Sequence, residues 1–160
     1  MQESPVIARI KQHFGDDLIA THQHLGEDTV IIRREKIVEL ARFLKEDPEL
    51  QFNFLMDLAA VDYLPRRPRF EVVYHFFSLR NRLRLRVKVP VPEHDAVVDS
   101  LCPLWKGADW YEREAWDMFG IRFRNHPDLR RILMYDEFEG HPLRKDYPYN
   151  KRQPLIGPRD

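Results

Sequence analysis

The chain has 160 residues, of which 43% are hydrophobic, and this predicts one globular domain rather than a disordered protein. Lys plus Arg and Asp plus Glu both number 26, so no net charge attracts nucleic acid or an anionic membrane. Cys102 is the only cysteine, which excludes an intrachain disulfide and any iron–sulfur or thiolate zinc site held by this chain alone. We expect neither a signal peptide nor a membrane span, because the N-terminus lacks an apolar run and no stretch of about eighteen apolar residues occurs.

Two helices and a hairpin are predicted in the first 50 residues. The apolar residues of 5–17 and of 36–46 recur at helical spacing, and Pro48 ends the second helix. Residues 19–25 and 29–33 have the composition of two strands joined by a turn. This part of the chain therefore has the predicted order helix, strand, strand, helix.

Three strands are predicted next, at 52–61, 70–79 and 82–89. In the last of them, Leu and Val alternate with Arg and Lys, which predicts one buried and one solvated face. The sequence Pro-Val-Pro at 90–92 is expected to end this strand, because proline lacks the backbone N–H that a sheet needs.

Two further helices are predicted before the composition changes. One begins at 96–101 and the other covers 109–119. Asp109 and Glu112 have the spacing of a capping box for the second helix, and Gly120 suits its C-terminal end.

This order of elements predicts the α+β class, with helices packed on one face of a largely antiparallel sheet over residues 1–125. Residues 126–160 are predicted to form an extended, Pro-rich C-terminal tail, because they contain five of the twelve prolines. The tail also carries apolar residues, among them Tyr135 and Phe138. A segment that cannot build its own core but carries such residues usually binds a partner, and we predict that this tail does so.

The acidic residues Glu112, Glu114 and Asp117 raise the possibility of acid–base catalysis or metal binding. Glu112 and Glu114 point to different sides of a helix, whereas Glu114 and Asp117 share a face. No Glu-x-x-His pattern accompanies them. The favoured interpretation is therefore ion pairing and capping.

The histidines give weak metal signals. His126 and His141 each precede a proline and lie fifteen residues apart without a third ligand nearby, which is poor spacing for zinc. His22 and His24 share one side of a predicted strand and are interpreted as partly exposed strand residues.

Nucleic-acid binding is the main alternative from another functional class. Residues 66–88 contain eight basic residues and one acidic residue, Glu71, as an RNA-binding sheet surface would. The basic face of 82–89 itself holds no aromatic residue for base stacking. A solvated face, or one next to acidic groups, is favoured. Neither a Gly-rich phosphate loop nor a nucleophile elbow occurs.

Three consecutive blocks near the C-terminus carry a family resemblance. The blocks are ERE-x-W-D-M-F-G-I at 112–121, H-P-D-L-R-R-I-L at 126–133 and G-H-P-L-R-K-D-Y-P at 140–148. In this order and spacing they closely resemble the signature region of the C subunit of the proton-pumping NADH:quinone oxidoreductase, respiratory complex I, in its stand-alone form. The preceding α+β layout and the segment at 57–63 are also similar to that family.

The resemblance implies a structural subunit of the peripheral arm, on the cytoplasmic side of the membrane in bacteria. The complex would pass electrons from NADH through FMN and iron–sulfur clusters to quinone. This chain would hold no cofactor, and would dock beside the D subunit, which forms the quinone chamber with the B subunit. Equivalent chains serve membrane-bound hydrogenases, formate hydrogenlyases and F420H2- or ferredoxin-dependent complexes, which stay open as alternatives.

We expect the partner-binding surface to consist of arginines that pair with carboxylates, of aromatic anchors, and of the acidic, histidine and tyrosine residues between them. No catalytic, cofactor-binding or metal-binding residue is predicted. The expected partner-binding residues are Trp110, Glu112, Arg113, Glu114, Trp116, Asp117, Phe119, His126, Arg130, Arg131, His141, Arg144, Asp146 and Tyr147.

Overall fold

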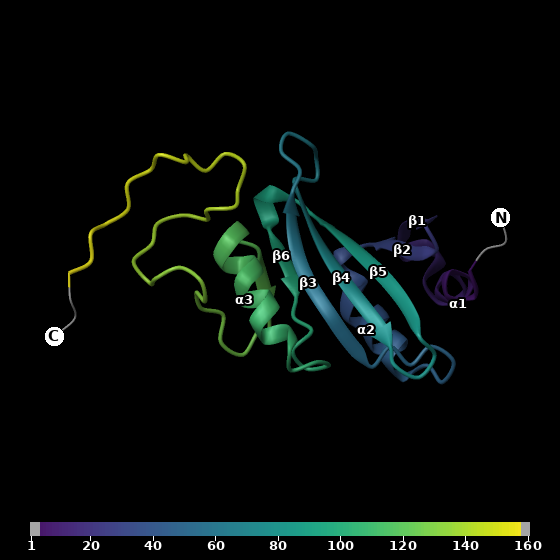
Figure 1. The fold of residues 1–160 in the computed structure, drawn as a ribbon. Coiled ribbons are helices and arrows are strands. Elements are labelled where there is room, and N and C mark those ends of the chain that lie inside the picture. Colours follow the sequence, from purple (N-terminus) through teal and green to yellow (C-terminus); the bar gives the residue numbers. More distant parts are fainter. Residues whose placement is uncertain (1–3, 158–160) are drawn as a thin grey trace.

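The computed structural model describes residues 4–157 and confirms an α+β fold with three helices and a mostly antiparallel five-stranded sheet. Figure 1 shows its elements in space. In chain order they are α1 (Pro5–Phe14), β1 (Leu18–His24), β2 (Glu27–Ile32), α2 (Ile37–Glu46), β3 (Phe54–Asp62), β4 (Phe70–Ser78), β5 (Leu83–Val91), β6 (Val97–Asp99), α3 (Ala108–Phe119) and β7 (Arg122–Arg124).

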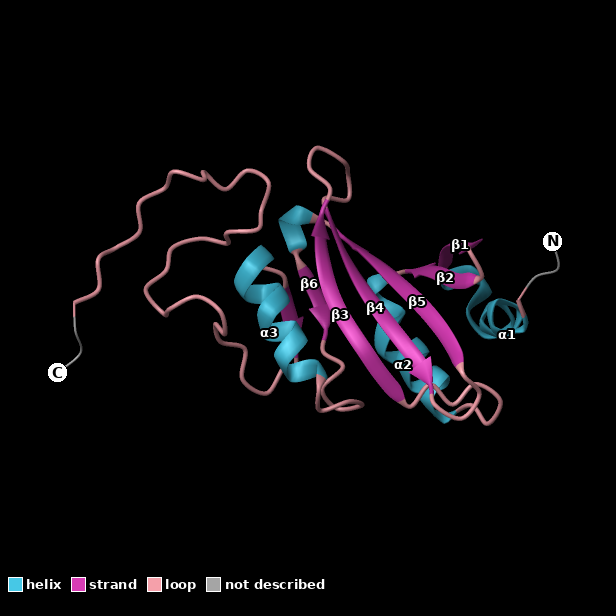
Figure 2. Cartoon of the chain, viewed as in Figure 1, coloured by secondary structure: helices cyan, strands magenta, loops and turns pink. Residues whose placement is uncertain are grey.

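The five-stranded sheet has the order β1-β2-β5-β4-β3 (Figure 2). All neighbouring strands are antiparallel except β2 and β5, which run parallel. Tyr74 in the middle of β4 pairs with Leu58 on one side and Val87 on the other. This order leaves β3 and β1 as the two edge strands, and β3 is the edge beside which α3 lies (Figure 1).

The core forms where the apolar faces of the predicted helices and strands meet. Ile37, Leu40, Ala41 and Leu44 of α2 are completely buried, as their helical spacing predicts. They pack in one cluster with the alternating apolar residues of β4 and β5. Burial of each such leucine or isoleucine side chain contributes roughly 1.5–3 kcal/mol.

The segment 96–101 is not a helix, contrary to the sequence prediction. It contains the short strand β6, which pairs in parallel with β7. The Ser100 N–H also donates to the Arg124 carbonyl oxygen at 2.9 Å. Valines at 97 and 98 favour an extended backbone, and their partner strand lies more than twenty residues later in the chain. The strand pairing of β6 with β7 therefore overrides the local helical pattern, and the spacing of nearby residues does not reveal this pairing.

The sequence prediction ended this strand before Pro90. In the structure, β5 continues through Pro90 to Val91. Its pairing with β2 stops at Lys88, whereas its pairing with β4 continues to Val91. Pro90 therefore lies where the strand has a neighbour on one side only. A proline is tolerated there because its missing N–H removes no hydrogen bond on the open side.

The two ends of α3 test the predicted caps. The capping box is wrong: the N-cap is Gly107 without a side-chain hydrogen bond, because the helix starts at Ala108 and places Asp109 in its first turn. The C-terminal prediction is confirmed, since Gly120 has φ 77° and its N–H donates to the Trp116 carbonyl oxygen at 2.8 Å.

The C-terminal segment, residues 125–157, contains neither helix nor strand. It leaves β7, passes along α3 and then runs away from the sheet (Figure 1). No helix among residues 4–157 is long and apolar enough to cross a membrane.

Candidate partner-binding surface

Asp117 on α3 is the main attachment point of the C-terminal segment. Its side chain is 0% exposed, and its Oδ2 atom accepts hydrogen bonds from the backbone N–H groups of Ile132, Leu133 and Met134 at 3.1, 2.8 and 2.9 Å. Its Oδ1 atom accepts from Arg131 Nη1 at 2.5 Å. Burial raises the pKa of this carboxyl, but these donors outweigh burial and hold that pKa below its ordinary value.

Arg113 also binds the part of the C-terminal segment that Asp117 holds. Its Nε and Nη2 atoms donate to the backbone carbonyl oxygens of Arg130 and Arg131 at 3.2 and 3.1 Å. Its guanidinium also lies 5.2 Å from the centre of the Trp110 ring. This arginine fork is therefore used within the chain, on carbonyl oxygens rather than on carboxylates.

Arg131 joins the two halves of the segment. Its Nη2 atom donates to the carbonyl oxygens of Phe138 and Gly140 at 2.9 and 3.0 Å. The guanidinium lies 5.7 Å from the Trp116 ring centre and 5.5 Å from that of Phe138. The segment thus folds back over the side chain that holds it to Asp117.

The C-terminal end of α3 receives two more side chains of the segment. His141 Nδ1 donates to the Asp117 carbonyl oxygen at 3.0 Å, and Arg144 Nε donates to the Phe119 carbonyl oxygen at 2.6 Å. These carbonyls have no partner inside the helix, so the two side chains satisfy groups that would otherwise need water. Burial lowers the pKa of His141, which favours its neutral form. Gly120 leaves the space for both residues, as a Cβ there would lie 2.6 Å from Arg144 Nη2.

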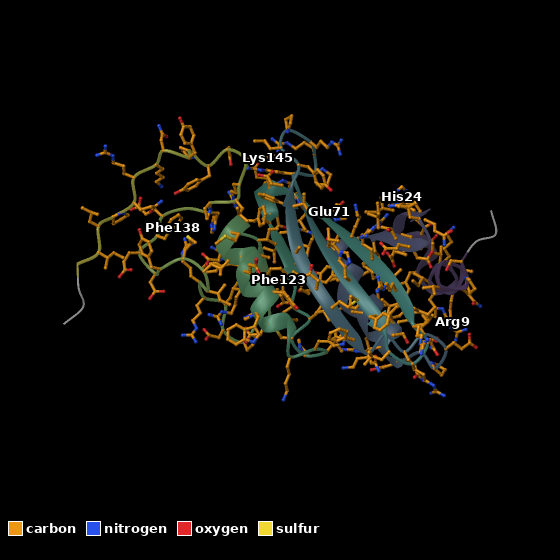
Figure 3. The ribbon with its side chains drawn as sticks, in the orientation of Figure 1. Arg9, His24, Glu71, Phe123, Phe138 and Lys145 are labelled. Atoms are coloured by element: carbon orange, nitrogen blue, oxygen red, sulfur yellow. The ribbon has the colours of Figure 1, made fainter. Side chains whose placement is uncertain are left out.

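Arg69 forms a second attachment point at the start of β4. Its side chain is 1% exposed, and its Nη2 atom lies 2.8 Å from Asp62 Oδ2 and 2.6 Å from Asp146 Oδ1. Its Nη1 atom also contacts Glu93 Oε1 at 2.5 Å, and the Lys145 N–H donates to Asp62 at 2.9 Å. Figure 3 shows Lys145 beside the C-terminal end of β3, where Asp62 lies. Burial raises the pKa of Asp62, but its bonds to Arg69 and to Lys145 bring that pKa to about 2.

Glu112 is buried where the segment begins. Its Oε1 accepts from the Leu101 N–H at 2.7 Å, and its Oε2 from Ser100 Oγ at 2.6 Å and from Cys102 Sγ at 3.4 Å. His126 Nε2 lies 3.9 Å from Oε2. Burial raises the pKa of Glu112 and raises that of Cys102 to about 12.

One group of described residues, Cys102, Glu112 and His126, brings potential metal ligands within 4.8 Å of one another. The hydrogen bonds of His126 argue against a metal centre. Its Nδ1 accepts from the Asp128 N–H at 3.0 Å, so the ring proton is on Nε2, which donates to the Asp109 carbonyl oxygen at 3.3 Å. A metal needs an unprotonated nitrogen, and ligand histidines usually donate from the other one. The group fits a hydrogen-bonded network that fixes the start of the segment.

The predicted partner-binding residues fall into two sets. Most of their polar groups bond within the chain, as described above, and Tyr147 stacks on Phe138 with ring centres 6.1 Å apart. Trp110, Glu114 and Arg130 are exposed, and Arg130 pairs with Asp128 at 2.9 Å. The structure also exposes several apolar residues here that were not among the predicted partner-binding residues, although the apolar character of the tail was the reason for predicting that it binds a partner. They are Leu133, Tyr135, Leu143, Tyr149, Leu155 and Ile156.

Sequence reasoning also missed Asp62 and Arg69. Their burial has no local signature, since a charged loop with several arginines ordinarily lies in solvent. The pairing of Asp62 with Phe70 places the two charges at the same end of the sheet.

The basic face of β5 is largely paired with acidic residues of the chain itself. Arg86 lies 2.8 Å from Glu27, and Lys88 lies 3.2 Å from Glu71. Phe77 of β4 pairs with Arg84, so the sheet does place one aromatic residue beside this face. Because two of its cations are already neutralised, the face offers little excess charge for nucleic-acid phosphates.

Comparison with known proteins decides the family. The family described as "Respiratory-chain NADH dehydrogenase, 30 Kd subunit" matches residues 30–153. The chain belongs to this family. It is 48% identical over 158 residues to the NADH-quinone oxidoreductase C subunit of Geotalea uraniireducens (strain Rf4), covering 98% of this chain and 95% of that protein. The same subunit of Roseiflexus sp. (strain RS-1) is 51% identical over 148 residues, 92% of this chain and 85% of that protein.

Two solved structures share this fold. A trypsin-resistant fragment (1-134) of Nqo5 is 34% identical, has a TM-score of 0.69 and covers 78% of this chain and 98% of its own. A chain of a membrane-bound sulfane sulfur reductase, an archaeal respiratory membrane complex, shares the fold with a TM-score of 0.74 at 22% identity, covering 92% and 88%. The chain is therefore a subunit of NADH-quinone oxidoreductase, a membrane-associated respiratory enzyme complex of several subunits.

Proposed function

We propose that the chain is a structural subunit of the peripheral arm that docks and positions the D subunit, which holds the quinone site, with the B subunit as a second neighbour. The chain itself carries no cofactor and no catalytic site. Electrons pass from NADH through FMN and iron–sulfur clusters of other subunits to quinone, coupled to proton translocation. In bacteria this places the chain on the cytoplasmic face of the inner membrane.

The observation that carries the proposal is the two-sided character of residues 126–157. The inner side is held to α3 and β4 by Asp117, Arg113 and Arg69. The outer side exposes large apolar side chains, and Tyr149 is 98% exposed. Apolar residues held in place on a surface, with no core of their own to enter, mark a protein–protein interface.

Two features support a role without a cofactor. The chain offers one cysteine, and that thiol is bonded to Glu112 with its pKa raised to about 12. A thiolate is what an iron–sulfur cluster needs, and this pKa disfavours it. The nearby His126 carries its ring proton on Nε2, the nitrogen that lies 3.9 Å from Glu112 Oε2.

The experiment is co-purification with the tagged D subunit after Leu133→Asp and Leu143→Asp are introduced together. Both side chains are exposed, so the folded chain should tolerate them while the interface loses apolar contact. The matched control is Leu79→Asp, since Leu79 is similarly exposed at the end of β4. We expect the double variant to lose the D subunit and the control to retain it. Normal assembly of the double variant would contradict the proposal.

The alternative is the equivalent subunit of a complex with another electron donor, such as a hydrogenase, a formate hydrogenlyase or an F420H2- or ferredoxin-dependent complex. The fold shared with the sulfane sulfur reductase chain fits this alternative, whereas the relatives at 48–51% identity favour NADH. Purified complex that reduces quinone with NADH supports the main proposal. Reduction only with another donor supports the alternative.

A further inference from the structure

A groove runs between the edge strand β3 and helix α3. Its volume is about 320 Å³, the lower end of the range of binding pockets. Ala59 and Ala60 line the strand side, Met118 lines the helix side, and Leu143 of the C-terminal segment also lines the groove. The Leu143 N–H donates to the Met118 carbonyl oxygen at 3.1 Å, so the backbone of Leu143 is held to α3.

The backbone of β3 is open along this groove. At the start of the strand, the carbonyl oxygens of Asn53 and Met56 accept from Trp105 Nε1 and from the Tyr111 hydroxyl, each at 3.1 Å. From Leu58 to Val61, the described residues form no hydrogen bond to β3 other than the ladder to β4. The alanines at 59 and 60 add only small side chains to this stretch. An open strand edge pairs readily with an extended segment.

The rim of the groove is acidic. Asp57 stands on the strand side and Glu114 on the helix side, and both are exposed. Neither carboxylate takes part in a salt bridge with any described residue, whereas Glu27, Glu71 and Asp128 do. Two unpaired carboxylates on facing walls of an apolar groove favour a ligand that presents cations on both sides of an apolar side chain.

We propose that this groove binds an extended segment of the neighbouring subunit in which an apolar side chain is flanked by lysine or arginine. The apolar side chain packs against Met118 and Leu143, and the cations lie against Asp57 and Glu114. The strand wall from Asp57 to Ala60 is about 10 Å long, which matches about three to four residues of extended chain. The inference rests on the proposed docking function, because Leu143 belongs to the segment that docks.

A photo-reactive residue at position 59 tests the occupant in the assembled complex. Ala59 is exposed inside the groove, so its replacement should leave the fold unchanged. We expect a cross-link to one segment of a neighbouring subunit with a lysine or arginine within two positions of the linked residue. The absence of a cross-link, or a linked segment without such a basic residue, would overturn the inference.

Charge reversal tests the rim. Asp57→Lys and Glu114→Lys together should reduce recovery of the full-length chain with the tagged D subunit by roughly tenfold or more, because like charges then face each other. Asp16→Lys with Glu46→Lys is the matched control, since both are exposed acids outside the groove, and recovery should change less than about twofold.

The two proposals fail in different ways. If Leu133→Asp with Leu143→Asp abolishes recovery of the D subunit but the rim variant does not reduce it, the groove inference is wrong and docking stands. If neither pair of substitutions reduces recovery, both are wrong. Reduced recovery of the rim variant, with an unchanged control, supports the groove.

Discussion

Oδ1 of Asp117 lies 2.5 Å from Nη1 of Arg131, and this buried pair connects α3 to the C-terminal segment. The same carboxylate accepts three consecutive backbone N–H groups. One side chain therefore sets the path of the segment over the helix, and the partner-binding role proposed for this segment depends on it.

Asp117→Ala should destabilise the protein by about 3–5 kcal/mol, because it leaves Nη1 of the largely buried Arg131 and three backbone N–H groups without their acceptor. Chemical denaturation followed by fluorescence measures the free energy of unfolding. Glu114→Ala, three residues away and exposed, should change it by less than about 0.5 kcal/mol. Equal effects of the two substitutions would show that the Asp117 bonds are unimportant.

The Asp62 carboxylate predicts a loss of stability in acid. Its pKa in the folded chain is about 2, below the ordinary value of 3.8, so the folded state favours the charged form. That contribution, up to about 2 kcal/mol, is present above roughly pH 4 and is lost as pH falls through the folded pKa. Unfolding measured from pH 6 to pH 2 should show this decline, and Asp62→Asn should flatten it. An equally steep decline in the variant would assign the effect to other groups.

Gly120→Ala should loosen the C-terminal segment. The added Cβ would lie 2.6 Å from Arg144 Nη2, and φ of 77° disfavours any residue with a Cβ, so the cost is about 1–3 kcal/mol. Limited proteolysis should cut the segment faster than in the unaltered protein. Gly15→Ala is the control, because nothing lies within 4 Å of its Cβ and its φ is −44°. That substitution should be neutral or slightly stabilising.

Cys102 should react slowly with thiol reagents although it is partly exposed. Burial raises its pKa to about 12, so its thiolate fraction near pH 8 is roughly a thousandfold below that of a free cysteine. A spectrophotometric disulfide-exchange assay measures the rate. Denaturant should restore rapid reaction, and rapid reaction of the folded protein would contradict the prediction.

Residues with regular apolar spacing made much of the fold predictable. Ile37, Leu40 and Leu44 identify α2, and the alternation from Leu83 to Val89 identifies β5 and its buried face. The pairing of β6 with β7 was not predictable, because Val97 and Arg122 are distant in sequence and the pair is short. The spacing of apolar residues within one segment shows which of its faces is buried. It does not show which other segment packs against that face.

Some residues of the candidate site were selected from the sequence, but their contacts were not predictable. Glu112, Arg113 and Asp117 were selected for their types, yet Asp117 bonds chiefly to backbone N–H groups, which have no side-chain signature. The arginine forks bind carbonyl oxygens of the chain itself. Their direct contact with a partner stays a prediction, whereas Leu133 and Leu143 are apolar side chains that the structure leaves exposed.

The guanidinium of Arg69 joins three stretches that lie far apart in sequence, through Asp62, Glu93 and Asp146. Separation of any of these stretches removes a charged partner from the buried guanidinium of Arg69. Local opening should therefore be concerted, with amide protons in all three stretches exchanging at a common rate. Local unfolding of the end of the sheet at Arg69 would then also release the C-terminal segment from the sheet.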